Sequence, residues 1–231
     1  MEFGLLAAAV LALGALRLAL LPEGADAGRL WDLALTATIA GLATGRLAAM
    51  VASGVNPLTH PLDVLVVRGG VSTAAATFGA LAMAAWRSRD DLWATLDALA
   101  APALYALAGW HAGCVFTGSC LGTATDLPWG VAATAGSVPR HPTEAYAAVL
   151  LLVAATAVWL LRRNGRTRAG VLVSAAAVAV AAIRLATEPL RASFGSGRTT
   201  SYAIGLALSV GLLAWRRWRP DGYEGGRLLP R

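Results

Sequence analysis

The sequence predicts an all-α, polytopic membrane protein with about seven transmembrane helices, its N-terminus outside and its C-terminus in the cytoplasm. Three observations lead to this prediction. Of the 231 residues, 57% are hydrophobic and 14% are charged, and the mean hydropathy is +0.62. Apolar stretches recur that approach the roughly 20 residues needed to cross the hydrocarbon core of a bilayer. All 19 basic residues are arginines, and many cluster between alternate apolar stretches. We therefore expect a single integral membrane domain over residues 1–231.

The expected membrane-spanning segments follow one another along the chain and are separated by polar loops. The first segment has no basic residues before it and no convincing cleavage site, so we interpret it as a retained span and not as a signal peptide. The third contains the pair Gly69-Gly70, which permits close helix approach or a break in the helix. The approximate bounds are 3–21, 33–53, 64–86, 94–117, 143–161, 170–187 and 201–216.

Arginines mark the loops that we expect in the cytoplasm. They follow the third, fifth and seventh segments, at Arg87 and Arg89, at 162–168 and at 216–219. Because cytoplasmic loops carry an excess of Arg and Lys, this pattern places the tail from about residue 217 in the cytoplasm. The pI near 10.3 is explained by this topology, and we expect no nucleic-acid partner.

Three charged residues follow an uncharged run near the end of the sixth segment. Residues 170–183 carry no charge, whereas Arg184, Glu188 and Arg191 follow at intervals of four and three residues. This spacing places all three on one helix face, although Pro189 is expected to break or kink the helix there. Ionisable groups inside a membrane span are costly and usually serve a function. We interpret these three as part of a functional site.

Further polar residues come from the outward halves of segments or from outer loops. His141 and Pro142 precede the fifth segment, whose N-terminal N–H groups favour an anion. Arginine suits phosphate because its guanidinium is planar and forms paired hydrogen bonds. We therefore expect a site for an anionic, phosphate-bearing ligand at the extracytoplasmic face; for Arg68, snorkelling to the interface is an equal alternative. The residues expected to converge are Arg68, His111, Arg140, His141, Arg184, Glu188 and Arg191.

Two cysteines, Cys114 and Cys120, lie six residues apart near the outer end of the fourth segment. On a continuous helix this spacing would not bring the side chains together well, so we expect buried, unreactive thiols. The sequence has neither a second cysteine pair nor a histidine-rich partner at ligand spacing. We expect neither a metal nor a cofactor.

Several motifs resemble those of the prolipoprotein diacylglyceryl transferase family, over most of the chain from about the second segment onward. Residues 140–146, RHPTEAY, are similar to the family's RHP-(S/T)-Q-L-Y element. Residues 69–72, GGVS, resemble the start of its GGMSxHGG element, and residues 184–191 fit its RFxxExxR element. Seven spans with the N-terminus outside are also the architecture that this resemblance implies.

The resemblance is incomplete at the family signature GRxGNFxNGExxG, which aligns with residues 110–122. Its glycines are present as Gly113, Gly118 and Gly122. Its Arg, Asn and Glu are replaced by His111, Cys114 and Ser119, and the histidine of the GGMSxHGG element by Ala74. The scaffold therefore matches the family better than the catalytic positions do.

The resemblance implies transfer of a diacylglyceryl group from phosphatidylglycerol to the lipobox cysteine of a prolipoprotein signal peptide, at the outer face of the bacterial cytoplasmic membrane. Glycerol phosphate leaves as an anion, so we expect Arg184 to clamp phosphate, with Arg140 or Arg191 assisting and Glu188 orienting an arginine. His111 and His141 are candidate catalytic groups, each with a structural role as the alternative. The remaining expected binding residues are Arg68, Gly69, Gly70, Gly113, Gly118, Gly122 and Tyr146.

Two other classes of function stay open. The substituted signature favours a non-catalytic protein on the same scaffold, which binds phospholipid or signal peptides without chemistry. An intramembrane Arg/Glu pair also suits a small transporter, but the two halves of the chain show no convincing internal repeat.

Overall fold

The structure is a computed structural model, and it describes residues 2–59, 71–115, 120–192 and 197–218. Within these ranges the regular secondary structure is helical, accompanied by two isolated β-bridges, Ala124 to Arg140 and Val131 to Arg140. The all-α prediction is confirmed. The chain divides into two compact units, which we describe separately: Met1–Ala19 with Ala100–Arg231, and Leu20–Leu99.

The unit Leu20–Leu99 is built mainly on a pair of helices. It contains the short 3-10 helix η1 (Leu21–Asp26), α2 (Ala27–Ala52), α3 (Thr73–Arg87) and the first residues of α4 (Leu92–Val115). Helices α2 and α3 pack closely because glycines leave room for the neighbouring backbone: a Cβ at Gly45 would lie 2.7 Å from the Cβ of Ala76. Arg68, Gly69 and Gly70 lie outside the described residues.

Helix α3 begins at Thr73, inside the span expected at 64–86, and residues 64–70 of that span lie outside the described residues. Ser72 precedes it with an extended backbone, and its hydroxyl accepts a hydrogen bond from the Ala75 amide at 3.5 Å. This is the geometry of an N-cap residue, which satisfies an amide that the helix cannot pair. Hydropathy alone did not locate this boundary.

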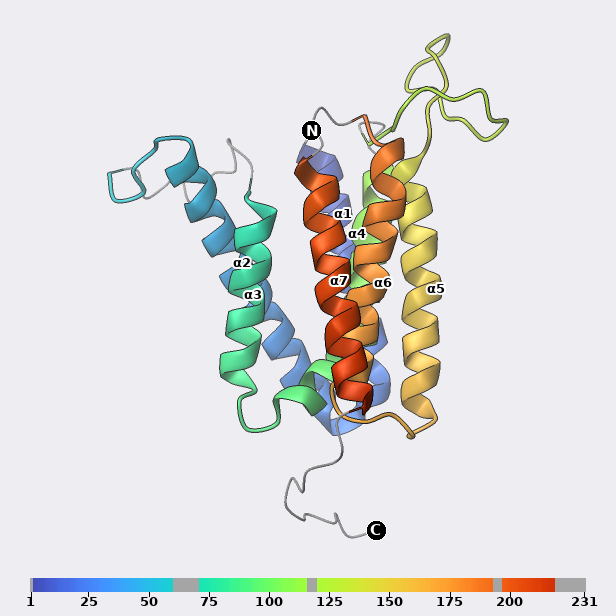
Figure 1. The fold of residues 1–231 in the computed structure, drawn as a ribbon. Helices are drawn as coiled ribbons and strands as arrows, with labels where there is room; N and C mark the ends of the chain where they lie inside the picture. Colours follow the sequence, from blue (N-terminus) through green and yellow to red (C-terminus); the bar gives the residue numbers. More distant parts are fainter. Residues whose placement is uncertain (1, 60–70, 116–119, 193–196, 219–231) are drawn as a thin grey trace. The chain divides into compact units, whose positions relative to one another are not determined.

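The other unit is a helical bundle. It contains α1 (Glu2–Leu20) up to Ala19, the rest of α4, α5 (Thr143–Arg163), α6 (Val171–Thr187), the 3-10 helix η3 (Glu188–Leu190) and α7 (Gly197–Trp218). Figure 1 shows α5, α6 and α7 side by side, and α5 packs on α6 as α6 does on α7. Helices α4, α5 and α6 supply its buried core, which consists of Ala100, Ala101, Leu104, Ala108, Leu151, Ala155, Val158, Leu172 and Ala176.

Long apolar helices with apolar outer surfaces make this an α-helical membrane protein. On α5, for example, Val149 and Val153 are 59% and 63% exposed, as lipid-facing side chains would be. Seven spans and the orientation of the termini stay predictions. Within the described residues, four stretches are long and apolar enough to cross a bilayer, namely Ala7–Ala52, Leu92–Val115, Thr143–Arg163 and Val171–Leu190.

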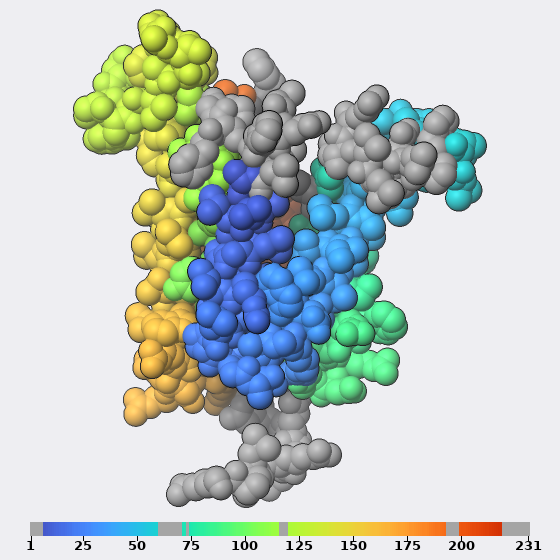
Figure 2. All heavy atoms as spheres, turned by 180° about the vertical axis from the view of Figure 1, so that it is seen from behind, coloured from blue at the N-terminus to red at the C-terminus, as the bar shows by residue number. Residues whose placement is uncertain are grey.

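One end of the bundle unit carries the polar residues of interest. There α4 ends, α5 begins and α6 runs into η3, while the turn after α5 and the end of α7 lie at the opposite end (Figure 1). The loop 120–142 stands out from the first end as a separate lobe, yellow-green in Figure 2. Its base is held by the two backbone hydrogen bonds between Val131 and Arg140, of 2.9 and 3.0 Å.

Candidate functional site

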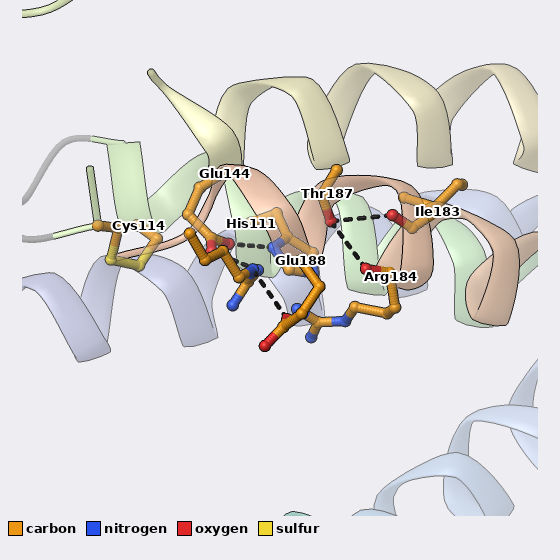
Figure 3. A network of polar contacts seen from close by, with 9 residues as sticks. His111, Cys114, Glu144, Ile183, Arg184, Thr187 and Glu188 are labelled. Carbon is orange, nitrogen blue, oxygen red and sulfur yellow. Dashed lines mark hydrogen bonds and ion pairs between the residues drawn. A yellow bond between two sulfur atoms is a disulfide. The ribbon is translucent and has the colours of Figure 1, made fainter. Parts of the chain in front are cut away.

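A buried histidine and a buried carboxylate form the centre of the site. His111 lies in the last turns of α4 and is 2% exposed, and Glu144 lies in the first turn of α5 and is 9% exposed. Nδ1 of His111 is hydrogen-bonded to Oε2 of Glu144 (Figure 3). A carboxylate is stabilised at the N-terminus of a helix, where free N–H groups and the helix dipole favour negative charge. This position therefore suits an ionised Glu144.

Arg191 completes the coordination of that carboxylate. Its Nη2 donates a hydrogen bond to Oε1 of Glu144 at 2.5 Å, and its Nε lies 3.8 Å from Oε2 of Glu188. Each oxygen of Glu144 thus has a partner, which a buried charge requires because its desolvation is costly. The result is a network that connects α4, α5 and the segment after α6.

The three charges at the end of the sixth segment meet, but not on one helix face. Helix α6 ends at Thr187, and the 3-10 helix η3 begins at Glu188 and contains Pro189. Arg191, which follows η3, has an extended backbone. The expected break at Pro189 is confirmed, since proline lacks the N–H that a continuing helix would pair. The expectation of a single face is wrong, because the chain leaves the α-helix before Arg191.

Arg184 extends from the last turn of α6 toward Glu188, as Figure 3 shows. It is half-buried, and within the described part of the chain its guanidinium has no hydrogen-bond or ion-pair partner. Glu144, Glu188 and Tyr202 are close enough to act on its charge. Arg184 is therefore the cation of this cluster that is available to an added anion.

The base of the loop 120–142 forms a second group of polar contacts beside the first. Arg140 Nη1 donates to the carbonyl oxygen of Gly122 at 3.1 Å. Tyr146 accepts a hydrogen bond at its hydroxyl from Trp129 Nε1 at 2.8 Å, and this hydroxyl lies 3.4 Å from His141 Nδ1. Arg140, His141 and Tyr146 thus gather around the loop, apart from the contacts of His111.

Two of the expected binding glycines have packing roles. A Cβ on Gly113 would overlap the backbone of Ala8 in α1, and one on Gly122 would overlap the carbonyl oxygen of Leu190. Gly113 thereby lets α1 approach α4, and Gly122 lets the loop approach η3. Their expected role in substrate binding stays a prediction. Gly118 lies outside the described residues.

The expectation of free thiols is wrong, because Cys114 and Cys120 form a disulfide with a Cα–Cα distance of 5.9 Å. That expectation assumed a continuous helix through both residues. A continuous helix would separate Cα atoms six residues apart by about 9 Å, whereas those of the two cysteines lie within the range that a disulfide requires. The bond attaches the loop to the end of α4, one helical turn beyond His111.

The structure thus brings together His111, Arg184, Glu188 and Arg191 from the predicted set, and adds Glu144, which sequence reasoning did not select. The signal for Glu144 was a charged residue in the first turn of a helix that carries no further charge before Arg162. Within the described residues, no group of three or more His, Cys, Asp or Glu side chains is arranged to hold a metal ion.

A family model for prolipoprotein diacylglyceryl transferase matches residues 1–216. Three relatives carry the name phosphatidylglycerol–prolipoprotein diacylglyceryl transferase. The one from Phenylobacterium zucineum is 27% identical over 209 residues, covering 81% of this chain and 72% of the relative. The one from Chlamydia trachomatis is 29% identical over 199 residues, covering 79% and 73%. The one from Solidesulfovibrio magneticus is 32% identical over 141 residues, covering 58% of this chain and 53% of the relative, about half its length.

Proposed function

The chain belongs to the prolipoprotein diacylglyceryl transferase family, and we propose that it transfers a diacylglyceryl group from phosphatidylglycerol to the lipobox cysteine thiol of prolipoprotein signal peptides. The thiol sulfur bonds to the glycerol carbon of the lipid, and glycerol phosphate leaves. In this proposal the protein crosses the bacterial cytoplasmic membrane several times, and the polar end of its bundle unit lies at the outer face.

The observation that carries this proposal is the half-buried Arg184 guanidinium, which has no hydrogen-bond or ion-pair partner within the described residues. It stands beside a network whose other cation, Arg191, is already paired with Glu144. A phosphodiester bound here would give Arg184 a partner, and the guanidinium would stabilise the charge that develops on the leaving phosphate. We assign Arg184 to the lipid phosphate and Glu188 to orienting the adjacent guanidiniums.

The arginines at the other end of the bundle unit support the placement of the site at the outer face. Arg162 and Arg163 end α5, and Arg216 and Arg217 lie in the last turn of α7. Because positive loops stay in the cytoplasm, the end that holds His111 and Glu144 is extracytoplasmic. The disulfide supports the same orientation, since disulfides persist in oxidising compartments outside the cytosol.

The loop residues have a supporting role in this proposal. Arg140 supports the loop through the Gly122 carbonyl and keeps further N–H groups for the headgroup. His141 and Tyr146 line the base of the same loop, where a signal peptide approaching from the outer face would meet them. Arg68, Gly69, Gly70 and Gly118 keep their expected binding roles.

The test is direct. Purified protein in phosphatidylglycerol-containing vesicles is incubated with a lipobox peptide, and the peptide is examined by mass spectrometry for a diacylglyceryl group on its cysteine. Arg184→Gln should lower turnover about 100-fold or more, the usual cost of losing a group that stabilises transition-state charge. Arg166→Gln, an exposed arginine of the turn after α5, is the matched control and should retain turnover. Equal turnover in the two variants would remove Arg184 from the site.

The alternative is a non-catalytic protein that binds phospholipid or signal peptide on this scaffold. The specific observation in its favour is the replaced signature, in which Cys114 is bound in a disulfide. Phosphatidylglycerol binding that depends on Arg184, together with an unmodified peptide, would establish this alternative and exclude the transferase.

A further inference from the structure

We propose that Glu144 is a positioning residue that makes Nε2 of His111 the acceptor for the proton of the cysteine thiol. This inference rests on the proposed transferase function and concerns its proton transfer. A thiol has a pKa of about 8.5, so only a few per cent is thiolate at neutral pH, and the thiolate is the nucleophile. A base at the site would therefore raise the reactive fraction.

The geometry of His111 determines which of its nitrogens is free. An ionised carboxylate can only accept hydrogen bonds, so the contact with Glu144 Oε2 places the hydrogen on Nδ1. In the neutral imidazole, Nε2 then carries the lone pair. Nε2 is buried and has no hydrogen-bond partner among the described residues. A buried polar atom without a partner is costly, which is consistent with an atom that is paired only when substrate is bound.

Glu144 is itself held in place, so the imidazole orientation is well defined. Arg191 Nη2 holds Oε1 at 2.5 Å, and this leaves Oε2 for His111. Among the described residues, the other charged groups near the pair are Arg184 at the end of α6 and Glu188 beside Arg191. Tyr202 of α7 is close enough to act on Arg184. The neighbouring Cys114 is in the disulfide and does not titrate.

The network is open to an approaching ligand on the side of Glu144. A small pocket of about 70 Å³ has Glu144 in its wall, together with Val115, Leu121 and Ala145. These apolar neighbours suit the uncharged side chains of a peptide or the upper part of an acyl chain, and they keep the carboxylate poorly hydrated. The pocket therefore places apolar groups of a substrate next to Glu144, the partner of His111.

The chemical step balances without any further reactant. The S–H proton moves to Nε2 of His111, and the thiolate attacks the glycerol carbon that carries the phosphoester. The S–C bond forms as the C–O bond breaks, and the electron pair of that bond leaves on the phosphate of glycerol phosphate. The imidazolium, stabilised by Glu144, then releases its proton to solvent or to the departing phosphate.

The alternative is that the pair only holds α4 to α5, and His111→Asn separates the two possibilities. The amide nitrogen of Asn can replace Nδ1 and keep the hydrogen bond to Glu144, whereas nothing replaces Nε2. Turnover of the lipobox peptide in phosphatidylglycerol vesicles is measured from about pH 6.5 to about pH 9.5, on either side of the usual thiol pKa of about 8.5. Thermal unfolding of each variant in the same lipid reports whether it is folded.

We expect His111→Asn to be about 100-fold slower than wild type at the acidic end of this range, the typical contribution of a general base. The deficit should shrink as pH rises, because solvent then generates the thiolate. Glu144→Gln should show a smaller deficit of the same shape, and Arg166→Gln none. A deficit in His111→Asn that is absent or constant across pH would overturn this inference alone. An unmodified peptide with wild-type protein would overturn the proposed function, and this inference with it.

Discussion

Replacing Gly122 with alanine tests how the loop is coupled to the site. Gly122 is buried, its amide donates to the carbonyl oxygen of His141 at 2.8 Å, and the next amide, of Thr123, donates to that of Leu190 at 2.8 Å. A Cβ at Gly122 would overlap this Leu190 oxygen and lie 2.6 Å from Cγ2 of Thr143. Neither neighbour is the free end of a flexible side chain, so the backbone itself must move.

The magnitude follows from three contributions. Overpacking costs about 1–3 kcal/mol, and the lost hydrogen bond between Thr123 and Leu190 costs about 0.5–1.5 kcal/mol. Against these, replacing glycine by alanine restricts the unfolded chain and contributes about 0.4–1 kcal/mol to stability. The free energy of unfolding should therefore fall by about 2 kcal/mol. Because Arg191 follows Leu190 directly, the same shift moves Arg191 away from Glu144, and turnover should fall as well.

The assay compares thermal unfolding and transferase turnover of Gly122→Ala with those of Gly14→Ala. Gly14 lies in α1 of the same unit, and a Cβ there would meet nothing within 4 Å. The control should be neutral or more stable by up to about 1 kcal/mol, since alanine favours a helix more than glycine. For a chain of this size, about 2 kcal/mol corresponds to a decrease in Tm of roughly 4–8 °C. A Gly122→Ala protein as stable and active as the control would refute this reasoning.

Two further predictions concern the polar end of the bundle unit. The Cys114–Cys120 disulfide joins residues six apart in the sequence, and loss of chain entropy in the unfolded state predicts about 2 kcal/mol of stabilisation from it. Reductant should therefore lower the Tm of the wild-type protein. It should leave the Tm of the double variant Cys114→Ser/Cys120→Ser unchanged. Unchanged wild-type unfolding in reductant, with both thiols alkylated, would contradict this. Tyr146→Phe removes the hydroxyl that accepts the hydrogen bond from Trp129 Nε1, and it should lower the free energy of unfolding by about 0.5–1.5 kcal/mol. His141→Phe, which removes only the longer 3.4 Å contact with the same hydroxyl, is the comparison. A cost of Tyr146→Phe that is no greater than experimental error would indicate that water replaces the hydroxyl.

Hydropathy predicted the helices best where apolar sequence and helix coincide. The segment expected at 170–187 is α6, Val171–Thr187, and the one expected at 143–161 is α5, Thr143–Arg163. The prediction was poorest where a helix extends into polar sequence: α2 begins at Ala27 instead of residue 33, because its first turns contain Arg29 and Asp32. Such residues are compatible with helical backbone but not with the hydrocarbon core, so hydropathy reports the embedded part alone.

The sequence predicted which residues belong to the site better than it predicted which of them are in contact. The three charges Arg184, Glu188 and Arg191, which follow an uncharged run, identified the charged end of the sixth segment from the sequence. The pairing of His111 with Glu144 was not predictable, because 33 residues and a long loop separate them, and helical periodicity relates only neighbours on one helix. The disulfide was missed for a related reason: the end of α4 at Val115 changes which side chains can meet.

The contact between His111 and Glu144 joins two positions at which the sequence departs from the family pattern. The resemblance places arginine at the position of His111 and glutamine at that of Glu144, where this chain has a shorter imidazole and a carboxylate. Because the two side chains touch in a buried site, each change alters the environment of the other. We therefore expect the two substitutions to have been coupled.

A double-mutant cycle measures that coupling. His111→Arg alone places a larger side chain in a position that is 2% exposed, and Glu144→Gln alone removes the charge that Arg191 and His111 both contact. The double variant recreates the pair that the family pattern implies. Its free energy of unfolding should exceed the value expected from adding the two single effects, by about 0.5–3 kcal/mol. Effects that add to within about 0.5 kcal/mol would mean that the two positions vary independently, and that the contact between them did not select the histidine–glutamate pair.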